Sequence, residues 1–215
     1  MTRKERALLI LEKLEEVYPD VECSLNYSTP LEMLIATQLS AQCTDARVNI
    51  VTKPLFERYK NADDFANADY DELCEYIRSA GFYRNKAKNI IACCERIRDV
   101  YNGEVPDTME DLLTLAGTGR KTANLVLGDI FGKPAIVVDT HCIRLTNRMG
   151  LTTNSEPEKI EQDLRKIIPP EKGCHFCHQL VAHGRAVCTA RKADCGACNL
   201  NEVCKKVGLD KKKKK

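Results

Sequence analysis

The residues best suited to chemistry are a lysine and an aspartate that stand eighteen positions apart, Lys121 and Asp139. Lys121 lies in LAGTGRKTA (115–123), in the expected first turn of a helix, where the helix dipole disfavours further positive charge and favours the nucleophilic neutral amine. A carboxylate beside such an amine can steer protons and stabilise a cationic transition state. Alone, each residue has a simpler interpretation, a surface lysine and a helix N-cap, so the prediction depends on the pair.

The glycines before this lysine predict a tight hairpin between two helices and not a nucleotide-binding loop. In a P-loop the lysine follows the second glycine directly and a strand precedes the motif, whereas Arg120 intervenes here and DTMEDLLTL has helical period. Gly117 and Gly119 permit backbone conformations closed to other residues, so several N–H groups can converge on one phosphate. We expect a turn that grips a DNA backbone without reading sequence; the alternative is an ordinary loop between packed helices.

The twelve cysteines fall into two groups. Eight are scattered through helical-looking sequence and are expected to be reduced, mostly buried thiols. CHFCH, at 174–178, formally matches a haem-attachment motif, but buried helix thiols explain two of those eight more simply. The other four follow the spacing C-x6-C-x2-C-x5-C and form only one C-x-x-C pair, so spacing alone leaves zinc and an iron–sulfur cluster open: Cys188, Cys195, Cys198 and Cys204.

Apolar residues recur at helical spacing through most of the chain and predict an all-α fold. The expected helices include 3–17, 30–43 and 84–101, separated by glycine and proline breaks. AIVV, at 135–138, is the only strand-like piece and is too short and isolated to build a sheet.

The formal net charge of +2 depends on five lysines at 211–215, without which the chain would be slightly acidic. Affinity for nucleic acid must therefore come from local patches and backbone donors, with the lysine tail as a solvated terminus that can assist. The first twenty residues are typical of an amphipathic helix and not of a signal peptide, and no apolar run is long enough to span a membrane. We expect no membrane association and an intracellular location, the cytoplasm or nucleoid in a bacterium or archaeon.

The segment from LAGTGRKTA to CIRLTNR, 115–148, resembles the helix-hairpin-helix DNA glycosylases, and most closely the endonuclease III branch. LSAQCTD at 39–45, GFYRNKAKNI at 81–90 and HGRAVCTARKADCGACNLNEVC at 183–204 also resemble that branch, in the same order along the chain. The resemblance implies a two-lobed all-α architecture. Its expected parts are a central domain with the hairpin at 22–132, a second domain at 1–21 plus 133–210 with an iron–sulfur loop at 188–204, and a basic tail at 211–215.

The resemblance also implies a function and a cofactor. A monomeric bifunctional DNA glycosylase and AP lyase would remove oxidised pyrimidines from double-stranded DNA and act on abasic sites. Lys121 matches the nucleophile that forms a Schiff base before β-elimination, and Asp139 matches the carboxylate that assists. The family's [4Fe-4S] cluster resolves the choice of metal centre, with Cys188, Cys195, Cys198 and Cys204 as ligands.

Extrusion of the damaged nucleotide requires residues that fill the gap and hold the backbone. By resemblance Gln42 enters the gap and Phe82 is the wedge, an aromatic residue where relatives usually carry an aliphatic one. Ala116 and Thr118 replace a frequent proline and an apolar residue, which predicts a less rigid hairpin that still binds phosphate. The other expected DNA-binding residues are Gly117, Gly119, His141, Arg185, Arg191 and Lys192.

Two rival functions follow from the same residues. A monofunctional adenine or mismatched-thymine glycosylase would lack the lysine at position 121. An iron–sulfur DNA-binding protein without lyase activity would have no use for Lys121 together with Asp139.

Overall fold

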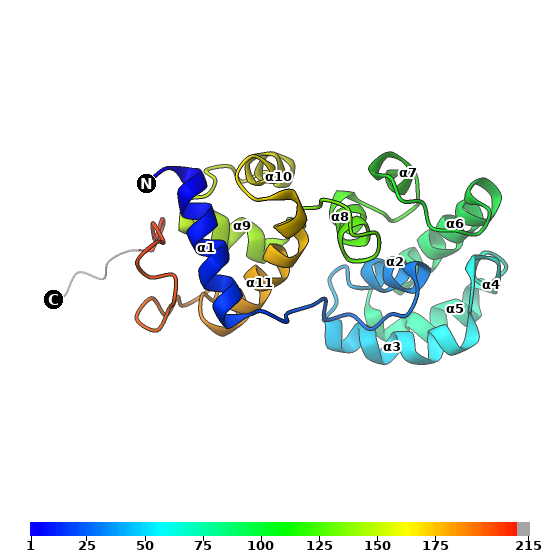
Figure 1. Cartoon of the computed structure of the whole chain (residues 1–215). Helices are drawn as coiled ribbons and strands as arrows, with labels where there is room; N and C mark the ends of the chain where they lie inside the picture. The colour runs from blue at the N-terminus through cyan, green and yellow to red at the C-terminus, as the bar shows by residue number, and fades with distance from the viewer. Residues whose placement is uncertain (210–215) are drawn as a thin grey trace. The chain divides into compact units, whose positions relative to one another are not determined.

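The computed structural model describes residues 1–209 and divides the chain into two compact units. We call Cys23–Gly132 the hairpin unit, and Met1–Glu22 with the residues from Lys133 onward the cysteine unit. Both are built from helices (Figure 1), and the described residues contain no β-strand, only an isolated bridge between Cys188 and Ala193. The predicted all-α class is confirmed. The lysines at 211–215 lie outside the described residues.

The hairpin unit is organised around one short, almost fully buried helix, α2. This helix packs against α3, α6 and α8, while α4 and α5 pack against α6 (Figure 1). Thr29 caps α2 and a proline occupies its first position, a combination that favours helix initiation. The helices of this unit are α2 (Pro30–Leu39), α3 (Asp45–Arg58), α4 (Ala62–Ala66), α5 (Tyr70–Ile77), α6 (Tyr83–Tyr101), α7 (Met109–Leu113) and α8 (Arg120–Asp129), with a 3-10 turn at Arg78–Ala80.

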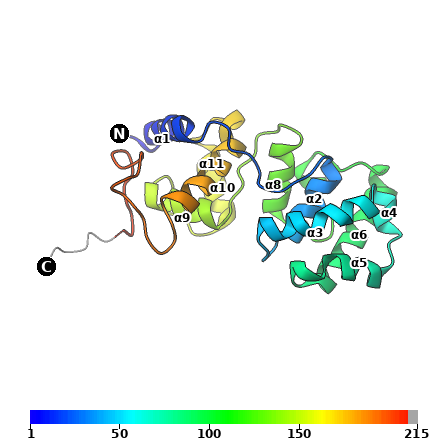
Figure 2. The same ribbon diagram turned by 90° about the horizontal axis from the view of Figure 1, so that it is seen from below.

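The cysteine unit is organised around α11, which packs against α1 and α9. Gln179 on α11 is fully buried and its amide donates to the Glu15 carboxylate at 2.7 Å and to the Tyr18 carbonyl at 3.3 Å. These bonds fix the end of the amino-terminal helix to the carboxyl-terminal third of the chain. The ribbons of α1 and α11 lie side by side (Figure 2). The helices are α1 (Arg3–Val17), α9 (Thr140–Met149), α10 (Pro157–Arg165) and α11 (Gly173–Ala186), with a 3-10 turn at Pro170–Lys172.

Helix boundaries follow local chemistry. At α1 the predicted range is confirmed, and Thr2 and Glu5 form a reciprocal capping box at its start. At α2 the predicted range, 30–43, is wrong at its end: the helix stops at Leu39, and the Ser40 hydroxyl donates to the Thr37 carbonyl at 2.8 Å. Within residues 1–209, none of the helices combines the length and apolar character needed to cross a bilayer.

Candidate functional site

The glycine hairpin joins α7 to α8 as predicted, but its two glycines do different things. Gly117 has φ +73°, a left-handed conformation that favours glycine, and a Cβ added there would lie 3.0 Å from the Asn89 Cβ. Gly119 has φ −95°, which any residue adopts, and open space around it. The expectation that both positions need glycine's backbone freedom is therefore right for Gly117 and wrong for Gly119. Gly119 instead begins α8 without a side-chain cap.

A buried glutamine holds the hairpin from α2. The Gln38 side-chain amide donates to the Ala116 carbonyl at 3.1 Å and to the Thr118 hydroxyl at 3.2 Å, and Gln38 is only 6% exposed. The two residues expected to loosen the turn are thus the ones that this amide contacts. Sequence reasoning missed Gln38, and the available signal was the polar pair Thr37 and Gln38 inside the otherwise apolar run LIATQL.

Lys121 lies in the first turn of α8, two residues after Gly119, as predicted. Its side chain is exposed, while the three residues that follow it are buried and anchor the helix. The amine therefore projects from a rigid, partly buried helix at the point where the hairpin ends. A nucleophile on a packed helix keeps its position better than one on a mobile loop.

The residues expected to enter the DNA, Gln42 and Phe82, lie on two exposed turns of the hairpin unit. We call residues 40–43 the Gln42 turn and residues 80–82 the Phe82 turn. Gln42 has φ 55° and Phe82 has φ 48°, so both are non-glycine residues in the left-handed region. Phe82 is 65% exposed, which is unusual for an aromatic side chain. Strained backbone of this kind is concentrated at functional sites.

A second buried polar residue, Lys86 on α6, connects these two turns. Its ammonium donates to the carbonyls of Leu39 and Ala41, each at 2.8 Å, and to the Ala80 carbonyl at 2.9 Å. Burial lowers the pKa of Lys86. Sequence reasoning missed this residue because GFYRNKAKNI offers two lysines and no indication that the first is buried.

Asp139 lies in the cysteine unit, where it caps α9. One carboxylate oxygen, Oδ1, accepts a hydrogen bond from the Cys142 main-chain N–H at 2.7 Å. The residue is half-buried, after an extended segment of four buried apolar residues at 135–138. The cap fixes the rotamer of the carboxylate and leaves Oδ2 outside that bond. Helix capping alone accounts for this geometry, so a chemical role depends on further evidence.

His141 is packed into a polar contact between α9 and α11. Arg144 Nη2 lies 3.1 Å from His141 Nδ1, and because the guanidinium can only donate, Nδ1 accepts and the ring proton is on Nε2. Burial lowers the pKa of His141; Asp139 opposes that shift and the Arg144 and Arg185 charges add to it. Gly184 permits the close approach, because a Cβ there would overlap the imidazole. His141 is thus a neutral, well-packed ring.

The four cysteines singled out by their spacing line one pocket of the cysteine unit. We call residues 188–204 the cysteine loop. Every one of the four is a free thiol, and Leu145, Met149 and Leu200 contribute apolar walls to the same pocket. Burial raises the pKa of the Cys198 and Cys204 thiols, and the neighbouring cysteines raise both further. Four cysteines therefore line one pocket with apolar walls, and thiols are a donor set suited to a metal centre.

Two arginines of α9 hold the start of the cysteine loop. Arg148 donates to the Cys188 sulfur at 3.2 Å, to the Thr189 carbonyl at 2.8 Å and to the Ala190 carbonyl at 3.2 Å. Arg144 donates to the Cys188 carbonyl at 3.2 Å. The loop is therefore tied to a helix by charged donors, one of which points at a cysteine sulfur. Such donors stabilise a thiolate.

The three basic residues expected to contact phosphate lie near this loop. Arg185 is exposed near the end of α11, and Arg191 and Lys192 are exposed within the loop. The loop turns tightly at Lys192, whose N–H donates to the Thr189 hydroxyl at 3.0 Å while its carbonyl accepts from that hydroxyl at 2.6 Å. Exposed cationic side chains at these positions are accessible to an anionic backbone.

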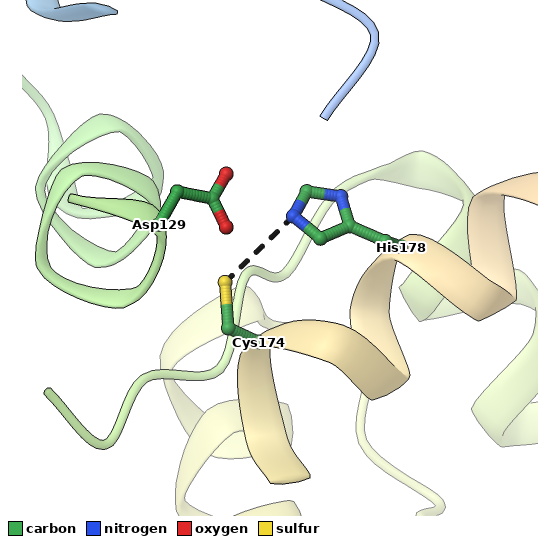
Figure 3. Close-up of side chains that lie close together, drawn as sticks. All are labelled: Asp129, Cys174 and His178. Atoms are coloured by element: carbon green, nitrogen blue, oxygen red, sulfur yellow. Dashed lines mark hydrogen bonds between the residues drawn. The ribbon is translucent and has the colours of Figure 1, made fainter. Parts of the chain in front are cut away.

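The CHFCH segment lies within α11, so both cysteines are helix thiols as expected, but Cys174 is only half-buried. The Cys174 sulfur lies 3.8 Å from His178 Nε2, one helical turn further on (Figure 3). Cys177 is buried and accepts a hydrogen bond from the Val137 main-chain N–H at 3.2 Å. This cysteine fixes the extended segment that leads to Asp139 and so has a packing role.

Comparisons with known proteins give one consistent result. A family model described as HhH-GPD superfamily base excision DNA repair protein matches residues 35–170. Endonuclease III of Synechocystis sp. is 52% identical over 204 residues, which cover 94% of this chain and 93% of that protein. A solved structure of an endonuclease III trapped as a covalent intermediate with DNA has a TM-score of 0.90 and 43% identity, and the match covers 96% of this chain and 97% of that one.

A more distantly related solved structure is similar to this chain in its fold alone. The structure of a thermostable thymine-DNA glycosylase has a TM-score of 0.85 and covers 94% of this chain and 96% of that one, but only 21% of the residues are identical. Similarity at that level shows a shared fold alone. The two proteins similar at 43% and 52% identity are both endonucleases III.

Proposed function

Because the chain belongs to the endonuclease III branch of the HhH-GPD superfamily of base excision DNA repair proteins, we propose that it removes oxidised pyrimidines from duplex DNA and cleaves the strand at the abasic site that results. It is a bifunctional base excision repair enzyme, a DNA glycosylase with AP lyase activity. Because its substrate is DNA, we propose that it acts in the cytoplasm or nucleoid if its source is a bacterium or archaeon. The observation that carries the residue-level proposal is an exposed Lys121 amine in the first turn of α8, directly after the hairpin.

Lys121 is the nucleophile of this proposal. Its amine attacks the sugar carbon that bears the damaged base, and the bond between that carbon and the base breaks with its electron pair leaving on the base. The amine and the opened sugar then form a Schiff base, from which β-elimination breaks the strand. A relative that is 43% identical has been trapped as a covalent intermediate with DNA, which supports a covalent route here.

Asp139 assists these steps as the acidic partner. Its Oδ1 is occupied by the cap of α9, so Oδ2 is the oxygen that takes up a proton or stabilises the cationic sugar. The cap holds the carboxylate in one orientation, which lowers the cost of aligning it with substrate.

The hairpin binds the DNA backbone in this scheme. Gly117 supplies the left-handed turn, Gly119 leaves the start of α8 without a side-chain cap, and the helix dipole favours a phosphate there. Gln42 and Phe82 fill the gap left by the extruded nucleotide, and both have the exposed side chains that this role requires.

A [4Fe-4S] cluster is the proposed ligand of the cysteine loop. The residues fit such a group: four free thiols share a pocket with apolar walls, and Arg148 donates to one of the sulfurs. When bound, the cluster would cross-link four points of a segment too short to fold alone. The exposed Arg185, Arg191 and Lys192 would then contact phosphates from an ordered surface.

Borohydride trapping tests the proposal. Wild-type protein is incubated with duplexes containing an abasic site or thymine glycol and then reduced, so that a Schiff base becomes a stable cross-link. Capture of both duplexes is expected, with the adduct on the peptide that contains Lys121, and no capture by Lys121→Gln. Lys53→Gln, an exposed lysine on α3, is the matched control and should trap normally.

The acidic partner needs its own variant. Asp139→Asn keeps an oxygen for the helix cap, so folding should survive while the rate of trapping falls by about a hundred- to ten-thousand-fold. Wild-type protein that captures neither duplex would contradict the proposed function. An adduct on another lysine would contradict the assignment of Lys121 alone.

A further inference from the structure

The Lys86 side chain is a buried cation whose partners are unusual. Only 7% of the residue is exposed, and its three described hydrogen bonds, at 2.8, 2.8 and 2.9 Å, all end on main-chain carbonyls and not on a carboxylate. Three bonds use every donor of an ammonium group. Burying a lysine is costly, so such complete satisfaction by the main chain points to a specific task.

The three carbonyls belong to two segments that are far apart in the sequence. Leu39 and Ala41 lead into the Gln42 turn, and Ala80 leads into the Phe82 turn. The Lys86 main-chain N–H also donates to the Phe82 carbonyl at 3.1 Å, so the same residue holds the Phe82 turn from both its side chain and its backbone. A single nitrogen atom therefore joins the two turns.

Both turns need such support. Gln42 and Phe82 adopt left-handed backbone conformations that are unfavourable for residues with a Cβ, and both side chains are exposed, so neither is held by burial of its own side chain. Of the four non-glycine residues with positive φ among residues 1–209, these are the two that flank the carbonyls bound by Lys86. Without this ammonium, three carbonyls would lose their partner and the two turns would lose their direct connection.

We propose that Lys86 is a positioning residue for nucleotide extrusion, which fastens the Gln42 turn to the Phe82 turn so that both side chains enter the DNA as one preorganised unit. The inference rests on the proposed function, because it presupposes that these side chains enter DNA. Lys86 itself touches neither the DNA nor the reacting atoms; it acts through Gln42 and Phe82.

The test measures insertion separately from chemistry. The duplex carries a tetrahydrofuran abasic analogue, which the enzyme cannot cleave, opposite 2-aminopurine, whose fluorescence rises when it is unstacked. Wild-type protein should raise the fluorescence on binding. Lys86→Met keeps the length of the side chain and removes the ammonium, and it should reduce both the fluorescence change and the affinity for this duplex by about ten-fold or more.

Lys88→Met is the matched control, since Lys88 is exposed on the same helix, and it should behave as wild type. Circular dichroism establishes the temperature range in which each variant is folded. If Lys86→Met does not fold, Lys86→Arg takes its place, because a planar guanidinium cannot direct three donors at carbonyls that converge on one point. An unchanged fluorescence response in whichever Lys86 variant is folded would overturn the inference.

A double-mutant cycle separates positioning from general stability. In a Gln42→Ala/Phe82→Ala background the residues that Lys86 positions are gone, so adding Lys86→Met should weaken binding by less than about two-fold. If Lys86→Met weakens binding by the same factor in both backgrounds, Lys86 supports the fold and does not position Gln42 and Phe82. Borohydride trapping by wild-type protein distinguishes the two hypotheses. If wild-type protein does not trap DNA, the proposed function is wrong. If it does, and the Lys86 variant raises the 2-aminopurine fluorescence as wild type does, only the inference about Lys86 is wrong.

Discussion

The two turns of the hairpin unit and the cysteine loop are all irregular segments, but they are held in place by different means. In the hairpin unit, Lys86 gives hydrogen bonds directly to the main chain of the turns that it supports. In the cysteine unit, the arginine side chains of α9 bond the first three residues of the loop. Further along, the loop has longer contacts through its thiols, 3.5 Å from Cys198 Sγ to His183 Nε2 and 3.5 Å from Cys204 Sγ to the Arg148 carbonyl, and one Asn199 bond to the Lys13 carbonyl of α1. The rest of the loop surrounds a pocket lined by thiols.

This difference determines what each region depends on. Turns whose carbonyls are satisfied by buried side chains keep their shape as long as the protein core is intact. A loop folded around four sulfur atoms depends on whatever those sulfurs bind, because separate thiols do not cross-link it. The comparison predicts that a substitution in the hairpin unit disturbs only the segment that the residue supports. Loss of one cysteine, in contrast, should release the whole cysteine loop.

The largest effect is expected from breaking the cysteine set. Cys198→Ser should remove the absorbance of the proposed iron–sulfur cluster and release residues 188–204, because three thiolates would not hold such a cluster as four do. Hydrogen exchange read by mass spectrometry should show protection in the loop falling by roughly a hundred-fold or more, while peptides from the hairpin unit stay protected.

Cys174→Ser provides the control, because it removes a half-buried thiol of the same unit that lies outside the loop. It should leave the absorbance and the exchange of the loop unchanged. If Cys198→Ser keeps the protection of residues 188–204, the loop is held by its arginine contacts and the contrast between the two regions disappears.

A smaller, local effect is expected in the hairpin unit from Gln38→Met. The side chain keeps its volume but loses both donors, so the Ala116 carbonyl and the Thr118 hydroxyl lose a buried partner. The free energy of unfolding should fall by about 1–3 kcal/mol, measured by urea denaturation. Affinity for undamaged and abasic duplexes should fall by the same factor, because the proposed contact of the hairpin is with the DNA backbone and not with the bases.

Gln162→Met is its matched control, since Gln162 is exposed on α10, and it should change neither quantity. A Gln38→Met variant with wild-type stability and affinity would mean that the hairpin keeps its shape without the Gln38 hydrogen bonds. The replacement of proline and an apolar residue by Ala116 and Thr118 would then be unexplained.

The sequence predicts what depends on local pattern. The period of apolar residues locates α1 and the helix pair around the hairpin, and the glycine spacing places Lys121 in the first turn of α8. These features are determined by residues a few positions apart, through side-chain periodicity and capping. The family resemblance rests on the same short segments, and the comparisons confirm it.

Contacts between distant segments could not be predicted in this way. Gln38 meets Ala116 and Lys86 meets Leu39 across long stretches of chain, and nothing in the local sequence of either partner specifies the other. The end of α2 was missed for a related reason: the apolar period continues past Leu39, but the turn held by Lys86 overrides it. The left-handed backbone conformation of Gln42 follows from the hydrogen bonds that Lys86 gives to this turn and not from the residue type.

The smallest effects should come from alanine substitutions at the two hairpin glycines. These substitutions compare two positions within one turn. Gly117→Ala places a Cβ on a residue with φ +73°, 3.1 Å from Gln38 Oε1, and should lower the free energy of unfolding by about 1–2 kcal/mol. Gly119→Ala has φ −95° and no heavy atom within 4 Å of the added Cβ, so the loss should be at most about 0.5–1 kcal/mol, from the poorer N-cap.

Their effects on DNA binding should not follow their effects on stability. The Cβ of Gly119→Ala points into open space at the start of α8, where the phosphate is proposed to lie, so this nearly neutral substitution should still weaken binding to any duplex. Fluorescence anisotropy with undamaged DNA measures that loss, and urea denaturation measures stability in the same samples. If Gly119→Ala binds as tightly as wild type, the start of α8 does not contact the backbone, and the hairpin serves only to hold Lys121 in place.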